Sequence, residues 1–120
     1  MSTLQTKTLA FIMQTPNAWC NNIEQASKRG CADILACYNG KSWAIEVKDS
    51  KGDNLSGLQY ESLRRHALAG GVSCVVASPC NVAAVHRRIC QQDQDCKENG
   101  IETARIEVLT LEQFRFGFMS

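Results

Sequence analysis

Residues 32–48 read Ala-Asp-Ile-Leu-Ala-Cys-Tyr-Asn-Gly-Lys-Ser-Trp-Ala-Ile-Glu-Val-Lys, two largely apolar segments on either side of Asn39-Gly40. An Asn-Gly pair favours a two-residue type I′ turn, because both central positions of that turn need a positive φ. The apolar segments on either side are of the length and composition of strands. The stretch therefore predicts an antiparallel hairpin, with one strand before Asn39 and the other returning over 42–48.

Short-range patterns predict the elements around this hairpin. Ser56-Gly57-Leu58-Gln59 fits a capping box, in which an N-cap serine and a glutamine three residues later satisfy the first N–H groups of a helix. The expected elements are a helix over 4–13, a strand over 18–20, the hairpin, a helix over 57–69, a strand over 72–77, a helix over 81–91 that Asn81 can cap, a loop over 92–100, a strand over 101–109, and a helix opened by a second capping box at 110–113. This order predicts an α/β fold with a central mixed β-sheet flanked by helices.

Composition indicates an ordinary globular protein. The 120 residues are 44% hydrophobic and 21% charged, with a formal net charge of +1. A chain of this length has room for one domain, covering 1–120. No apolar run approaches the roughly 18 residues of a membrane-spanning helix, and the first residues lack the layout of a secretory signal. We therefore expect a soluble cytoplasmic domain with no membrane partner.

The seven cysteines do not follow a disulfide or zinc pattern. Their number is odd, and no Cys-x-x-Cys pair occurs. The closest cluster, Cys80, His86, Cys90 and Cys96, has no spacing known to us for a zinc site. The expectation is that these are reduced, buried thiols that pack as small hydrophobic side chains.

Three charged residues occupy the hairpin, where a buried charge is costly unless it is paired or binds a metal. Glu46 and Lys48 are two positions apart, so both side chains leave the same face of the strand. The turn brings Asp33 near the level of Glu46. Two carboxylates with open coordination positions suit Mg²⁺ or Mn²⁺, and a neighbouring lysine can orient water and stabilise charge on a phosphate. The alternative is a surface ion pair between Glu46 and Lys48 on an edge strand.

The wider pattern resembles a known family. Gly30-x-x-Asp33, a hairpin, Glu46-Val47-Lys48, a charged loop, and then Leu55-Ser56 with Gln59 opening a helix are similar to the virus-type replication-repair nuclease (VRR-NUC) domain. Ala18-Trp19-x-Asn21-Asn22 and Gly70-Gly71-Val72 also resemble segments of that family, so that the likeness covers about residues 4 to 90. The domain belongs to the PD-(D/E)xK nuclease superfamily, which implies a restriction-endonuclease-like core.

The resemblance assigns roles to individual residues. Asp33 and Glu46 would bind Mg²⁺ or Mn²⁺ with the backbone carbonyl of Val47, and Lys48 would be the catalytic lysine beside the attacking water. Gln59 would close the site, a role that competes with its place in the capping box.

The chain departs from the family at the first helix. Family members usually carry a glutamate there, whereas this chain has no acidic residue before Glu24, which follows the wrong element. Gln5 is the nearest substitute. Ala32 also replaces the proline that often precedes the aspartate.

These features predict a metal-dependent DNA endonuclease. By analogy with free-standing members of the family it would be a homodimer selective for branched DNA, in the manner of a Holliday-junction resolvase. DNA contacts are expected from Lys28-Arg29, Lys51 and Arg64-Arg65, which flank the proposed site in the sequence. One alternative is a nuclease-fold protein that binds nucleic acid with weak or no catalysis, and the missing first-helix acid favours it. Another is a small interaction domain in which the charged residues have no chemical role.

Overall fold

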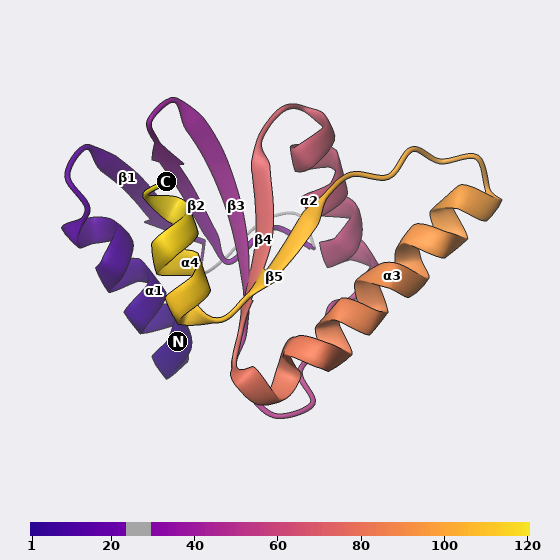
Figure 1. Cartoon of the computed structure of the whole chain (residues 1–120), viewed down its shortest axis with the longest axis horizontal. Coiled ribbons are helices and arrows are strands. Elements are labelled where there is room, and N and C mark those ends of the chain that lie inside the picture. Colours follow the sequence, from indigo (N-terminus) through magenta and orange to yellow (C-terminus); the bar gives the residue numbers. More distant parts are fainter. Residues whose placement is uncertain (24–29) are drawn as a thin grey trace.

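The hairpin forms at the predicted turn. Asn39 and Gly40 have φ of 52° and 77°, as a type I′ turn requires. They join strand β2 (Ile34–Tyr38) to strand β3 (Lys41–Lys48), which are antiparallel. The computed structural model describes residues 1–23 and 30–120 (Figure 1).

The hairpin is part of a five-stranded mixed sheet in the described part of the chain, with the order β1-β2-β3-β4-β5. Strand β1 (Ala18–Asn22) pairs antiparallel with β2, whereas β4 (Val72–Ala77) is parallel to β3, and β5 (Ile106–Leu109) is parallel to β4. Figure 1 shows the strands in this order across the molecule. The predicted α/β class, with a central mixed sheet flanked by helices, is confirmed.

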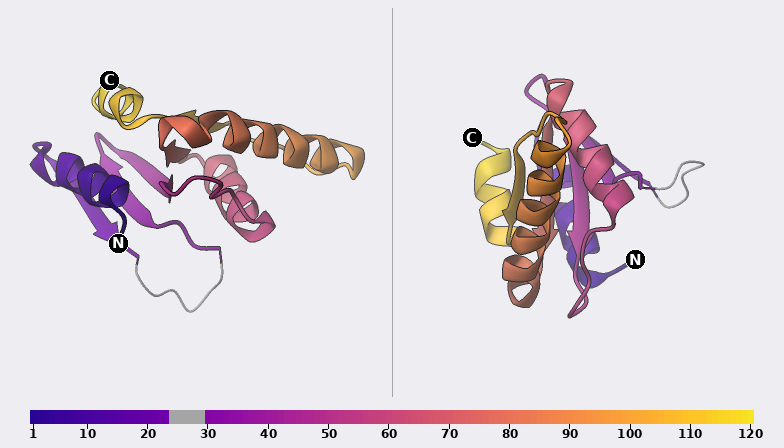
Figure 2. Two further views of the ribbon diagram at one scale, coloured as in Figure 1. Left: turned by 90° about the horizontal axis from the view of Figure 1, so that it is seen from below. Right: turned by 90° about the vertical axis from the view of Figure 1, so that its right-hand side faces the viewer.

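Helices pack on both faces of the sheet. Helices α1 (Thr3–Gln14) and α4 (Leu111–Phe118) contribute to a core on one face, and α2 (Gly57–Leu68) and α3 (Val82–Glu98) contribute to a core on the other. Figure 2 shows α4 and α2 on opposite sides of the strands. A short 3₁₀ turn, η1 (Pro79–Asn81), leads from β4 into α3. In the described ranges, no helix has the length and apolarity needed to cross a membrane.

Strand β3 is buried on both faces, and its two sides differ in chemistry. Ile45 and Val47 pack into the core beneath α1 and α4. Ala44 contributes to the core under α2 and α3, and Glu46 and Lys48 follow it on that same face because side chains alternate along a strand. The two charged residues are therefore inside the protein, which excludes the alternative of a surface ion pair on an edge strand.

The segment expected to be a loop over 92–100 is helical as far as Glu98, so this prediction was wrong. Its acidic residues suggested a loop, but Cys96 packs into the core and the hydroxyl of Tyr60 donates a hydrogen bond to the carboxylate of Asp93. These contacts with α2 hold two further turns of α3. The strand expected over 101–109 is correspondingly shorter and is limited to β5.

The prediction that the cysteines are buried was only partly correct. All seven thiols are free, and Cys74 and Cys96 are buried, whereas Cys31, Cys37, Cys80 and Cys90 are exposed. On β2, for example, alternation sends the side chain of Cys37 to the face opposite that of buried Ala36. Burial raises the pKa of the Cys74 thiol.

Candidate metal and catalytic site

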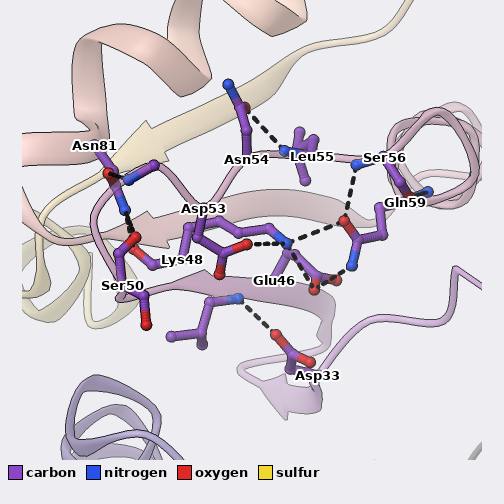
Figure 3. Close-up of polar contacts among 12 residues, drawn as sticks. Asp33, Glu46, Lys48, Ser50, Asp53, Asn54, Leu55, Ser56, Gln59 and Asn81 are labelled. Carbon is purple, nitrogen blue, oxygen red and sulfur yellow. Dashed lines mark hydrogen bonds and ion pairs between the residues drawn. The ribbon is translucent and has the colours of Figure 1, made fainter.

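A recess of about 240 Å³ lies beside the end of β3, and we call it the site recess. It contains every residue to which the sequence assigned a catalytic role. Its lining residues are Ser2, Gln5, Asp33, Glu46, Val47, Lys48, Asp49, Ser50, Asp53 and Gln59. Figure 3 shows the polar side chains converging there from β3, the loop that follows it, α2 and the segment before β2.

Asp33 reaches the site recess from the residue that precedes β2. Ile34 pairs with Ile45 in the hairpin. Because the two strands are antiparallel, the residue before Ile34, which is Asp33, lies beside the residue after Ile45, which is Glu46. The Asp33 Oδ2 atom accepts a hydrogen bond of 2.8 Å from the backbone N–H of Val47. This bond fixes the carboxylate against β3, at the level that the sequence predicted.

Glu46 is the most strongly perturbed acid of the site. The residue is 2% exposed, and its Oε1 atom accepts a 2.9 Å hydrogen bond from Gln59 Nε2. Its Oε2 atom is buried and has no hydrogen-bond partner within residues 1–23 and 30–120. Burial raises the pKa of the carboxyl to about 9, assisted by the negative charge of Asp33, while Lys48 opposes the shift. The site therefore favours either a proton on Glu46 or a cation beside it.

Lys48 places its ammonium among three acceptors. The Nζ atom lies 3.1 Å from Gln59 Oε1, 3.5 Å from Asp53 Oδ1 and 3.9 Å from Glu46 Oε1. Lys48 is 6% exposed, so its charge is held in a site with little contact with water. Asp53 lies in the charged loop five residues after Lys48 and was not predicted from the sequence as a site residue.

Gln59 caps its helix and bridges the charged pair at the same time. Its Oε1 atom accepts hydrogen bonds from the Ser56 backbone N–H (3.0 Å) and from Lys48, while its Nε2 atom donates to Glu46. The two roles that seemed to compete are therefore compatible. A carbonyl oxygen has two lone pairs, so one amide can serve the capping box and the site together.

Asn81 stands at the predicted N-cap position of α3, but its side chain anchors the loop that follows β3 instead of capping the helix. Its side chain makes no cap hydrogen bond; instead Nδ2 donates to the carbonyls of Lys48 (3.2 Å) and Ser50 (2.6 Å), and Oδ1 accepts from the Gly52 N–H (3.1 Å). The ends of parallel strands β3 and β4 meet at one edge of the sheet, which brings these segments together. A polar residue just after β4 was the signal that could have identified it.

Helix α1 brings an amide to the site recess where the family resemblance implied a glutamate. Gln5 lines the recess, and its Nε2 atom donates to Asn22 Oδ1 at 2.7 Å. Asp49 accepts a 3.0 Å hydrogen bond from the Leu4 N–H and so supplies a carboxylate to the first turn of α1. Glu24 lies outside the described residues.

The structure changes the expected set of DNA contacts. Arg64 is 8% exposed, and its guanidinium donates to Glu61 and to the Glu102 carbonyl, so a phosphate contact from Arg64 does not fit its position. The Arg65 side chain is 71% exposed and pairs with the same glutamate. Arg64, in contrast, lies on the side of α2 that faces the segment before β5, and it is therefore buried.

The other predicted DNA contacts are placed differently. Lys51 is exposed on the loop that follows Lys48, near the site recess. Lys28 and Arg29 lie outside the described residues. Among the described residues, Lys51 and Arg65 are thus the predicted cations that face solvent.

The donors in the site recess fit a hard divalent cation bound by two carboxylates. Asp33 and Glu46 offer oxygen ligands of the kind that Mg²⁺ and Mn²⁺ prefer, and the unpartnered Glu46 Oε2 atom is a position where a cation would offset buried charge. In the described ranges, no group of three or more His, Cys, Asp or Glu side chains is arranged to hold a metal ion. The other ligands of such an ion would be backbone carbonyls and water.

Comparison of the chain with models of protein families, with curated proteins and with solved structures found no match in any of the three.

Replacing Glu46 by glutamine is expected to stabilise the metal-free protein at pH 8. A carboxyl whose pKa rises from 4.5 to about 9 on folding contributes its stability below pH 4.5, where it is protonated in both states, and loses it as the pH rises toward 9. Each pKa unit corresponds to about 1.4 kcal/mol, so we expect a gain of a few kcal/mol at pH 8 that disappears near pH 4. The free energy of unfolding of both proteins, measured by urea denaturation in the presence of chelator at pH 4 and at pH 8, checks this expectation.

Glu61→Gln is the matched control. Hydrogen bonds from Arg64 and Arg65 lower the pKa of Glu61 to about 2, so this variant should be less stable than the parent protein at pH 8. If the stability of Glu46→Gln relative to the parent protein did not increase between pH 4 and pH 8, the raised pKa assigned to Glu46 would be contradicted.

Proposed function

We propose that this protein is a divalent-metal-dependent DNA endonuclease with a restriction-endonuclease-like core of the VRR-NUC type. The observation that carries the proposal is the convergence of half-buried Asp33 with buried Glu46 and Lys48, where the Glu46 Oε2 atom has no hydrogen-bond partner among the described residues. A set of this kind is costly to fold, and a metal would pair with its two carboxylates while a phosphate would pair with its ammonium. The order of the motifs in the sequence supports the same assignment.

Asp33, Glu46 and the Val47 carbonyl would hold Mg²⁺ or Mn²⁺, which when bound polarises a phosphate and makes a bound water more acidic. Lys48 would orient the attacking water and stabilise the negative charge that develops on the phosphate oxygens. Gln59 would hold the side chains of Lys48 and Glu46 in position through its hydrogen bonds to both. Asp53 would limit the movement of the ammonium from the solvent side.

The resemblance extends the proposal to structure-selective cleavage by a homodimer. A two-fold dimer presents two sites to two strands, which suits four-way and other branched DNA. This part of the proposal rests on the family likeness.

A second candidate is a nuclease-fold protein that binds nucleic acid without cutting it. The neutral Gln5 in the site recess favours this candidate, because an acidic residue there would have supplied a further metal ligand.

A cleavage assay on matched linear, nicked, flapped and four-way DNA, with Mg²⁺, Mn²⁺ or chelator, tests both candidates. The proposal expects cutting that requires the metal. Binding without cutting under every condition would favour the second candidate, and neither binding nor cutting would overturn both.

A further inference from the structure

A chain of hydrogen bonds runs from the surface serine Ser42 into the protein through His66, outside the site recess. The Ser42 Oγ atom lies 2.9 Å from His66 Nε2, and His66 Nδ1 lies 3.0 Å from the Ser73 Oγ atom. The Ser73 hydroxyl in turn donates a 2.7 Å hydrogen bond to the Leu63 carbonyl. We call Ser42, His66 and Ser73 the serine–histidine relay.

The innermost hydrogen bond fixes the direction of the other two. A serine hydroxyl has one hydrogen, and that of Ser73 is used on the Leu63 carbonyl, so Ser73 Oγ accepts a hydrogen bond from His66 Nδ1–H. Burial lowers the pKa of His66, so the ring is neutral at pH 8 and its one N–H proton is on Nδ1. The Nε2 atom is therefore an acceptor, and the Ser42 hydroxyl donates to it.

Three elements and one glycine hold the relay in place. Ser42 is on β3, His66 is in the last turn of α2, and Ser73 is on β4. A Cβ atom at Gly71, between α2 and β4, would lie 2.2 Å from the Cε1 atom and 2.5 Å from the Nε2 atom of His66. The imidazole therefore packs directly on the backbone at Gly71, where a side chain would displace it.

The relay has the order of groups that activates a serine: a nucleophile, a base, and a third group that orients the base. Ser42 is exposed, so a reactant can reach its Oγ atom, whereas Ser73 is 1% exposed and holds the ring from the interior. A neutral imidazole that already accepts from the hydroxyl is placed to take its proton as the oxygen attacks. General base catalysis of this kind typically contributes about 10²- to 10⁴-fold in rate.

We propose that Ser42 is an acyl-accepting nucleophile, with His66 as its general base and Ser73 as a positioning residue, and that its substrate class is an activated carboxylic ester. The Ser42 Oγ atom forms a bond to the ester carbonyl carbon while its proton moves to His66 Nε2. The bond from that carbon to the leaving oxygen then breaks, and the proton passes from Nε2 to the leaving group. The products are an acyl ester of Ser42 and a free alcohol or phenol. The step uses no group of the site recess, so it is independent of the proposed nuclease.

Acetylation by p-nitrophenyl acetate at pH 8, in the presence of chelator, tests the proposal. Peptide mass spectrometry locates each acetyl group, so modification of cysteines and lysines is counted separately. Ser42 should be acetylated at least about 10²-fold faster than Ser120, which is also exposed but donates its hydrogen bond to the Phe116 carbonyl. Equal rates at Ser42 and Ser120 would overturn the proposal.

Two variants remove the base in different ways. His66→Gln replaces the imidazole by an amide, whereas Gly71→Ala keeps the imidazole but places a methyl group where the ring lies. Each should lower the rate at Ser42 by about 10²-fold or more. Ser62→Ala removes a hydroxyl from α2 one turn before His66, and as the matched control it should leave the rate unchanged. Parent-like rates in both His66→Gln and Gly71→Ala would contradict the role of His66.

NMR of the imidazole nitrogens tests the relay in the unmodified protein, in which His86 is the only other histidine to assign. The His66 ring should be protonated on Nδ1 and unprotonated on Nε2 at pH 8. Ser73→Ala removes the acceptor of Nδ1–H, so it should move the proton toward Nε2 and lower the rate at Ser42 together. A loss of stability without a change of tautomer would assign Ser73 a structural role only and contradict its positioning role. A parent protein with the His66 proton on Nε2 would overturn the proposal.

Discussion

Lys48→Met is expected to lower the rate of DNA cleavage by about 10²- to 10³-fold or more, with little loss of metal binding. Methionine keeps the length and apolar stem that a 6% exposed position requires, but it removes the ammonium that lies near Glu46, Asp53 and Gln59. Loss of one charge aimed at a developing oxyanion typically costs this much in rate. Single-turnover cleavage and Mn²⁺ titration on the same preparation separate chemistry from binding.

Two further variants make the Lys48 experiment specific. Lys48→Arg should not restore the rate, because a planar guanidinium cannot occupy the place of a compact ammonium between these acceptors. Lys51→Ala removes an exposed lysine three residues away and should leave the rate of a saturated reaction nearly unchanged. A fully active Lys48→Arg protein would show that positive charge alone is sufficient there.

Asp33→Asn is expected to reduce cleavage to the level of the metal-free protein and to weaken Mn²⁺ binding by more than about tenfold. The asparagine side chain still has an oxygen to accept the Val47 N–H, so the end of the hairpin should keep its structure. What the substitution removes is one of the two negative charges that would hold the cation. Calorimetric titration with Mn²⁺ and urea unfolding together distinguish a lost ligand from a lost fold.

Asp53→Asn is the matched control for this change. Asp53 also lines the site recess, but its side chain is 44% exposed and its ion pair is with Lys48. We therefore expect a smaller effect on metal affinity than that of Asp33→Asn. The assignment of Asp33 as a ligand would be wrong if both variants bound Mn²⁺ as tightly as the parent protein.

The sequence alone determined those features that depend on neighbouring residues. The Asn39-Gly40 turn follows from a backbone conformation that few residue pairs adopt easily, and the capping box at Ser56 and Gln59 depends on atoms within one helical turn. The shared face of Glu46 and Lys48 follows from the two-residue period of a strand. Once the hairpin was predicted, the position of Asp33 followed as well.

Tertiary structure alone decided the features whose partner atoms come from distant parts of the chain. Helix α3 extends to Glu98 because Tyr60 contacts a residue 33 positions away, and Asn81 anchors the end of β3 across a comparable separation. Arg64 is buried because a carbonyl 38 residues later accepts its hydrogen bond. Periodicity and capping carry no information about such contacts, which exist only after parallel strands and their crossover helices have brought the segments together.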